Sequence, residues 1–153
     1  MTYSYEPHHF EDFEVGQTFQ SVGRTVTETD FVTHSMVTGD WTELHTNKEY
    51  AEDGNFGERV AHGPMTFSLA TGLVYRCGFL ERTVLAFLGM NYMDIPNPVF
   101  VDDTVSLEME VEDAREISSR DDSGLVVIDS TMTNQEDTVV FEGDMKFLIK
   151  SRD

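Results

Sequence analysis

The sequence predicts an α+β fold in which an antiparallel sheet wraps around one buried helix. Residues 63–76 carry apolar side chains on most sides and no acid, in a chain that holds 29 Asp and Glu residues. From residue 84 onward apolar and polar residues alternate with a period of two, which is typical of strands with one buried face. One strand and two helices are expected before the buried helix, and strands with short connections after it.

The first expected elements are a strand at 17–26 and a capped helix. Thr27 and Asp30 have the spacing of a capping box, with the Asp30 carboxylate in the place usually taken by Glu. The helix is expected to run through Thr38 and to stop at Gly39, because glycine readily adopts the left-handed conformation of a helix C-terminus.

The later elements follow from turn residues and periodicity. Residues 40–45 are expected to form a loop, and Asn47 to cap a short helix that ends at Glu52. Pro64 suits the first turn of the buried helix. The strands that follow are expected at 84–93, 105–111, 125–133 and 139–149.

Length and composition indicate one globular domain, residues 1–153, that can bury a core without disulfides. The single cysteine, Cys77, has no internal partner and is expected to be a buried, inert thiol. The N-terminal residues have no basic start and no apolar run, and no later stretch is long enough to span a membrane. A soluble, cytoplasmic protein is therefore expected.

The chain is strongly acidic, with a formal charge of −19 and only 10 Lys and Arg residues. Such a charge repels nucleic acid and anionic membranes, so neither is an expected partner. The acids are spread along the chain, which is not the pattern of an acidic interaction tail. At about 1 M salt the Debye length falls to ~3 Å, so this self-repulsion would be screened in a halophilic organism, which is the source we expect.

Asp40 and His45 are the candidate catalytic pair. A hydratase needs a group that takes a proton from water and a group that gives a proton to carbon, and a carboxylate and an imidazole that hold the same water can do both. Their spacing alone is also compatible with a helix cap beside a surface histidine.

Gly63 is the candidate oxyanion donor, because it begins the expected buried helix directly after His62. The first N–H groups of a helix have no internal partner and lie at its positive end, where they can bind a thioester oxygen as it gains negative charge. Glycine there lets a substrate approach the backbone closely. A simple turn before a helix explains Gly63 and Pro64 equally well.

The residues around these candidates resemble the MaoC-like (R)-specific enoyl-CoA hydratase family over nearly the whole chain and in the family's order. The most specific part of the resemblance lies within 38–63. The matching segments are 13–16, 25–30, 38–40, 44–45, 50–51, 61–63, 68–73 and 98–104.

The resemblance implies a hot-dog fold, a sheet wrapped around a central helix, with Asp40 and His45 as the catalytic residues and Gly63 as the oxyanion glycine. It also implies an acyl-CoA thioester substrate, no metal and no cofactor apart from the coenzyme A of the substrate. A homodimer, with active-site grooves at the subunit interface, is the expected assembly.

This chain departs from the family at two places. The family usually carries Asn-Pro where Thr42-Glu43 stand, and commonly a serine where Thr71 stands. Thr71 keeps the hydroxyl, while Thr42 is expected to replace only part of the hydrogen bonding of the asparagine. The expected substrate contacts are Trp41, Thr42, His62 and Thr71, with Arg59, Arg76 and Arg82 as candidates for the phosphates of coenzyme A.

Two other functions remain open. A hot-dog thioesterase would hydrolyse the thioester, but such enzymes often place an acid on the central helix, and 63–76 contains none. A catalytically silent acyl-CoA-binding subunit is compatible with Thr42-Glu43 in place of Asn-Pro. The retention of both Asp40 and His45 argues against it. His34 with His45, His62 and Asp40 could suggest a metal site, but the spacing matches no common zinc pattern.

Overall fold

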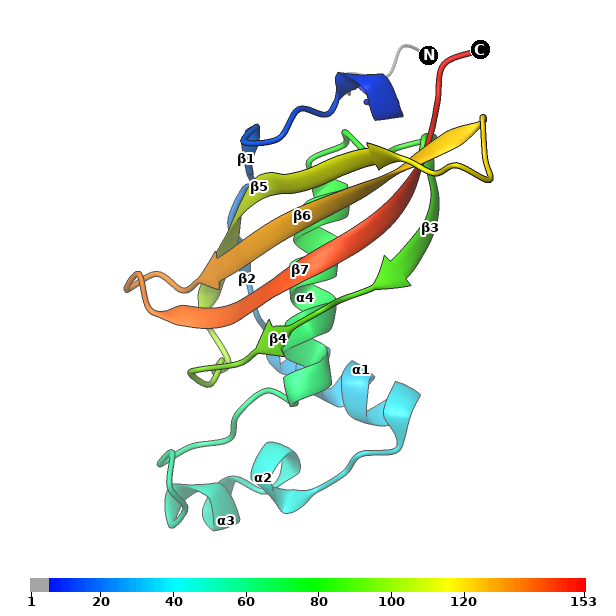
Figure 1. The fold of residues 1–153 in the computed structure, drawn as a ribbon. Coiled ribbons are helices and arrows are strands. Elements are labelled where there is room, and N and C mark those ends of the chain that lie inside the picture. The colour runs from blue at the N-terminus through cyan, green and yellow to red at the C-terminus, as the bar shows by residue number, and fades with distance from the viewer. Residues whose placement is uncertain (1–5) are drawn as a thin grey trace, which may run out of the picture.

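The computed structural model describes residues 6–153 and confirms the α+β architecture. A curved antiparallel sheet lies over one long helix, and three shorter helices gather at one end of that helix (Figure 1). The elements in chain order are η1 (Phe10–Asp12), β1 (Thr18–Gln20), β2 (Arg24–Thr25), α1 (Glu28–Thr38), α2 (Glu43–Thr46), α3 (Lys48–Glu52), α4 (Gly63–Arg76), β3 (Val84–Gly89), β4 (Met93–Asp94), β5 (Thr104–Glu116), β6 (Ser123–Thr133) and β7 (Val139–Lys150).

The sheet has the strand order β1-β5-β6-β7-β3, with β2 paired to β5 and β4 paired to β7. Every pairing is antiparallel, and Ile128 at the centre of β6 lies between Val111 of β5 and Met145 of β7. These three side chains are almost completely buried, so the alternation predicted for the later strands does place their apolar faces in one core.

Helix α4 packs one face into this core, and the predicted helix boundaries are confirmed. Leu73 is fully buried, and burying a side chain of this size contributes roughly 1.5–3 kcal/mol. The expectation of burial on most sides is wrong, because the opposite face of α4 is exposed at Pro64, Ser68, Gly72 and Tyr75. The other buried side chains of α4 are Met65, Thr66, Leu69, Ala70 and Val74.

Two of the expected strands are broken. The range 17–26 splits into β1 and β2, because the buried Ser21 hydroxyl accepts the Leu107 N–H that a continuous ladder would use. The range 84–93 splits into β3 and β4 at Gly89, which has a φ of 126°. The Asp144 carboxylate then accepts the N–H groups of Asn91 and Tyr92, at 2.7 and 2.9 Å, so this turn is fixed to β7.

The predicted ends of the shorter helices are confirmed. The Thr27 N–H donates to the Asp30 carboxylate at 2.8 Å, as the capping box requires. Gly39 ends α1 in the left-handed conformation with a φ of 77°. The Asn47 side chain accepts the Tyr50 N–H and so caps α3.

Figure 1 shows that α1, α2 and α3 all lie near the N-terminal end of α4, so the segment with the candidate pair meets the start of the central helix. Among residues 6–153, no helix is both long enough and apolar enough to cross a membrane.

Candidate active site

Asp40 follows directly on the left-handed Gly39, which turns the chain out of α1. Its Oδ1 accepts two hydrogen bonds from Thr42, one from the backbone N–H at 3.1 Å and one from the hydroxyl at 2.6 Å. The Thr42 hydroxyl is the main reason that the pKa of Asp40 lies below its usual value. Asp40 is therefore an anion at neutral pH, and its Oδ2 carries no hydrogen bond from the described residues.

His45 faces Asp40 from the one-turn helix α2, so the expected loop at 40–45 is wrong in its second half. The Nδ1 of His45 lies 2.7 Å from the backbone oxygen of Val60, and a carbonyl oxygen can only accept. Nδ1 therefore carries the proton, and Nε2 of the neutral ring is an acceptor.

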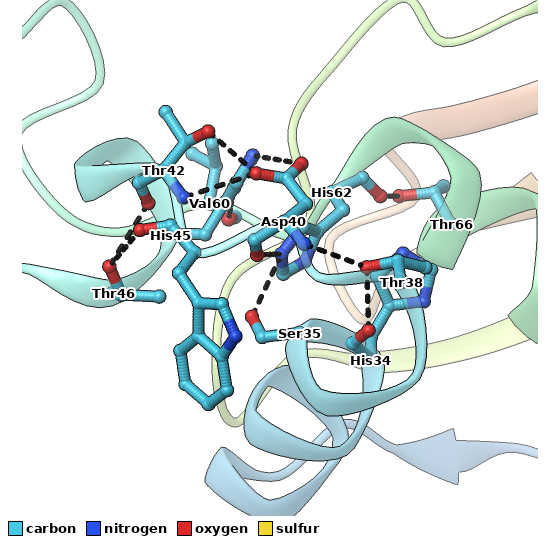
Figure 2. Close-up of polar contacts among 11 residues, drawn as sticks. His34, Ser35, Thr38, Asp40, Thr42, His45, Thr46, Val60, His62 and Thr66 are labelled. Atoms are coloured by element: carbon cyan, nitrogen blue, oxygen red, sulfur yellow. Dashed lines mark hydrogen bonds and ion pairs between the residues drawn. The ribbon is translucent and has the colours of Figure 1, made fainter.

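The gap between the pair is 3.8 Å, from His45 Nε2 to Asp40 Oδ2. This is too long for a direct hydrogen bond, and both atoms are acceptors when His45 is neutral. The two groups are therefore arranged to accept both hydrogens of one small donor such as water (Figure 2).

His62 lies next to this pair and is buried, with an exposure of 1%. Its ring stacks on that of His45, with centroids 3.9 Å apart and 26° between the planes. Its Nε2 lies 3.1 Å from Ser35 Oγ and 3.1 Å from the backbone oxygen of Asp40. Neighbouring side chains cover the ring, and the expected substrate contact of His62 stays a prediction (Figure 2).

Gly63 is the first residue of α4, next to His62. Its N–H donates to no other residue among 6–153, as expected for the open end of a helix. A Cβ added at Gly63 would lie 3.3 Å from Ile95 Cδ1, closer than most real Cβ contacts, so a side chain there would crowd Ile95.

Of two further residues predicted to contact the substrate, Trp41 lies next to the candidate pair in the chain and Thr71 lies far from it along α4. Trp41 follows Asp40 directly and is 53% exposed. Thr71 lies eight residues after Gly63, a rise of about 12 Å along the helix. Its hydroxyl donates to the Ser68 backbone oxygen at 2.7 Å, so the structure does not bring Thr71 to the pair.

The three candidate arginines do not meet at the pair within one chain. Arg59 is held by the Glu28 carboxylate through two hydrogen bonds of 2.6 and 2.8 Å. Arg76 and Arg82 lie at or beyond the C-terminal end of α4, about 20 Å along the helix from Gly63. Arg76 lines a groove of about 480 Å³ between α1 and α4, with Arg24, Asp30, Thr33, His34, Val37, Met65, Ser68, Leu69 and Gly72.

Sequence reasoning missed Ser35 and Val60, which hold the two histidines. The Val60 contact uses a backbone oxygen and leaves no trace in the type of side chain. Ser35 is one of four polar residues on the last two turns of α1, with Thr33, His34 and Thr38, and only the structure shows that it is the buried one.

The ligand-type atoms of Asp40, His45 and His62 lie within 4.8 Å of one another. The two imidazoles are stacked, however, so their lone pairs lie in nearly parallel planes 3.9 Å apart at the centroids, which does not favour convergence on one ion. This geometry is a poor match for a metal centre, and the absence of a metal and of a cofactor stays a prediction.

Comparison with known proteins identifies the family. Residues 12–134 match the model of the MaoC like domain. The chain belongs to the MaoC-like dehydratase family. It is 28% identical over 142 residues to the uncharacterized protein YdeM of Bacillus subtilis, covering 92% of this chain and 97% of that protein. It is 30% identical over 107 residues to a 3-hydroxybutyryl-CoA dehydratase of Methylorubrum extorquens, covering 67% and 63% of the two chains.

Solved structures show the fold of this MaoC-like protein. A monoamine oxidase regulatory protein from Archaeoglobus is similar with a TM-score of 0.87 and 31% identity, over 96% of this chain and 97% of that one. A Mycobacterium tuberculosis protein described as having a double hotdog fold is similar with a TM-score of 0.83 and 18% identity, over 95% and 45% of the two chains. The predicted hot-dog fold is confirmed.

Proposed function

We propose that this MaoC-like protein adds water to a trans-2-enoyl-CoA to form a (R)-3-hydroxyacyl-CoA, and catalyses the reverse reaction. The observation that carries the proposal is the 3.8 Å gap between two acceptors, Asp40 Oδ2 and His45 Nε2. The dehydratase from Methylorubrum extorquens, which acts on a short acyl-CoA by its name, supports the same chemistry.

In the forward direction the water donates one O–H to Asp40 and the other to His45. Its oxygen forms a bond to C3 of the enoyl group while one O–H bond breaks and its proton passes to the pair. The π electrons of the C2=C3 bond move toward the thioester oxygen. Asp40 and His45 then return the proton to C2. One water is consumed, and nothing is oxidised or reduced.

The N–H of Gly63 would stabilise the negative charge on the thioester oxygen, because it is unpartnered and lies at the positive end of α4. Removal of a comparable donor in other enzymes slows the reaction roughly 10²- to 10³-fold. Thr42 would keep Asp40 ionised and ready to accept the proton.

A thioesterase is less well supported, because no carboxylate of α4 is available to attack or to activate water at a thioester carbon. A silent acyl-CoA-binding subunit would not need the hydrogen bonds that hold both Asp40 and His45 toward one gap.

We further propose that the protein works as a homodimer in the cytoplasm. β3 is an edge strand, and its side chains Leu85, Phe87 and Leu88 are 47%, 41% and 51% exposed. Apolar side chains along an open edge favour pairing with a second chain. Within one chain Arg76 and Arg82 are remote from Asp40 and His45. A partner subunit could bring one of these arginines close to them.

The test is the absorbance of the enoyl-thioester band with crotonyl-CoA, in high-salt buffer. The wild type should consume the band, and Asp40→Asn and His45→Gln should each lose about 10²- to 10⁴-fold in rate. Appearance of free thiol would instead indicate a thioesterase. Binding without turnover, across short, medium and branched enoyl-CoAs, would indicate the silent subunit.

A further inference from the structure

The buried imidazole of His62 contacts three parts of the candidate active site, yet the mechanism above gives it no task. Its ring lies against the face of His45. Its Nε2 is placed between the Ser35 hydroxyl of α1 and the backbone oxygen of Asp40. His62 is therefore the one described side chain that joins α1, the Asp40 loop and the ring of His45 (Figure 2).

The hydrogen bonds of His62 show which of its two ring nitrogens carries the proton. The Asp40 backbone oxygen can only accept, so Nε2 carries the proton and Nδ1 does not. Nδ1 is buried and has no hydrogen-bond partner in the described part of the chain, so a second proton there would find no acceptor among these residues. Burial is also the main reason that the pKa of His62 is lowered. His62 is thus a neutral ring beside three titratable neighbours, His34, Asp40 and His45.

We propose that His62 is a positioning residue, whose ring fixes the plane of His45 and whose Nε2–H fixes the Asp40 backbone against α1. The proposal rests on the proposed function. Within residues 6–153 the His45 ring has one hydrogen bond, at Nδ1, and this bond alone leaves the ring free to tilt about it. The stacked His62 ring supports the face that would otherwise tilt, and so keeps Nε2 aimed at Oδ2 of Asp40. A misplacement of about 1 Å can slow an enzyme 10²-fold.

Two substitutions separate the two contacts of His62. His62→Phe keeps a ring against His45 but cannot donate to Asp40, and His62→Gln keeps a donor but removes the ring. Both should lower kcat for crotonyl-CoA hydration about 10- to 100-fold, with KM changed less than about twofold. His9→Gln, the same chemical change before η1, should leave both constants unchanged.

A readout that does not depend on turnover is the proton on His45 Nδ1, which the Val60 oxygen should shield from exchange with water. By NMR this proton should be visible in the wild type and in His62→Phe, and should broaden or disappear in His62→Gln. If the wild type shows no hydratase activity but the resonance still disappears in His62→Gln, the proposed function fails and the positioning role stands.

Three outcomes would overturn the positioning role. They are wild-type kcat in both His62 variants, a raised KM with unchanged kcat (which would assign His62 to substrate binding), and an Nδ1 resonance that survives in His62→Gln. If the His62 variants fail to fold, Ser35→Ala keeps the ring and removes only its partner on α1. It should lower kcat about threefold to tenfold at unchanged KM, and an unchanged kcat would also overturn the proposal.

Discussion

Thr42 has more influence on the charge of Asp40 than any other described residue. Its hydroxyl and its N–H both donate to the same carboxylate oxygen, and both favour the ionised form. The second carboxylate oxygen is left for the reaction. This division of the two oxygens fixes a partly exposed aspartate and still leaves one oxygen for the proposed role as a base.

Removal of the Thr42 hydroxyl should weaken the pair at low pH. Thr42→Val keeps the N–H but loses the stronger donor, so the pKa of Asp40 should rise toward its usual value. A raised pKa means that Asp40 becomes protonated at a higher pH, so the acidic limb of the kcat/KM profile should move upward. Asp40 remains ionised at neutral pH in the variant, so the fall in rate expected there, about tenfold, comes from the lost hydrogen bond that holds the carboxylate in place. Thr42→Ser should restore the wild-type profile, and an identical acidic limb in both variants would contradict this role for Thr42.

The candidate residues of the site could be named from the sequence, but the contacts that hold them could not. Asp40, His45 and Gly63 occupy a family-specific pattern. The support of His45 comes from a backbone oxygen and from a histidine that is remote in sequence, and no pattern of residue types encodes either contact. The burial of His62 depends on how the start of α4 docks against α1, which is a property of the tertiary structure.

The junction between α1 and Asp40 depends on one backbone conformation. Gly39 has a φ of 77°, and a Cβ there would meet no atom within 4 Å, so only the backbone disfavours a side chain. Gly39→Ala should therefore lower the free energy of unfolding by about 1–2 kcal/mol. Gly72 in α4 has equally open space but helical φ, so Gly72→Ala should raise it by about 0.5–1 kcal/mol.

Urea unfolding of both glycine variants would check that the two substitutions change the free energy of unfolding in opposite directions. A loss of stability in Gly39→Ala together with a gain in Gly72→Ala supports the backbone argument. A loss in both would indicate instead that the exposed face of α4 is covered in the assembled protein, because an added methyl group would then meet a partner.

At the level of elements, the sequence predicts those whose pattern is long and uniform. Helix α4 and strands β5, β6 and β7 have 11 or more residues each, and their periodicity determines their type. The breaks in these strands do not follow from local alternation because each involves a contact with a distant segment, the Leu107 N–H for the first and the Asp144 carboxylate for the second. Asp144 lies on β7 and holds the turn after β3, so the local alternation around residue 89 contains no sign of it.

The open edge of β3 predicts the assembly of the whole molecule. The protein should have twice the 17.4 kDa chain mass in light scattering, in high-salt buffer. Leu88→Lys places a charge on an exposed position of this edge and should shift the mass to that of one chain, since edge lysines block pairing of strands. An unchanged mass would place the interface elsewhere, and Ser118→Lys, in the turn between β5 and β6, is the matched control.

The excess of acid over base determines how the whole molecule should respond to salt. The acids are not offset by ion pairs, since 29 acids share 10 basic residues. On the outer face of the sheet Glu110 lies directly opposite Asp129, and like charges that face each other across strands are destabilising. Salt at 1 M or above reduces the screening length to about 3 Å, so this repulsion should vanish there.

The midpoint temperature of thermal unfolding should therefore rise by about 5 °C or more between 0.1 and 2 M KCl. This rise corresponds to an increase of roughly 1–2 kcal/mol in the free energy of unfolding. Glu110→Gln removes one member of the facing pair, so it should raise the unfolding temperature in dilute buffer and reduce the further gain from salt. Sucrose stabilises by exclusion from the surface without screening charge, so it should stabilise the wild type and Glu110→Gln equally. A wild type that gains nothing from salt would rule out repulsion as the limit on its stability, and with it the expectation of a halophilic source.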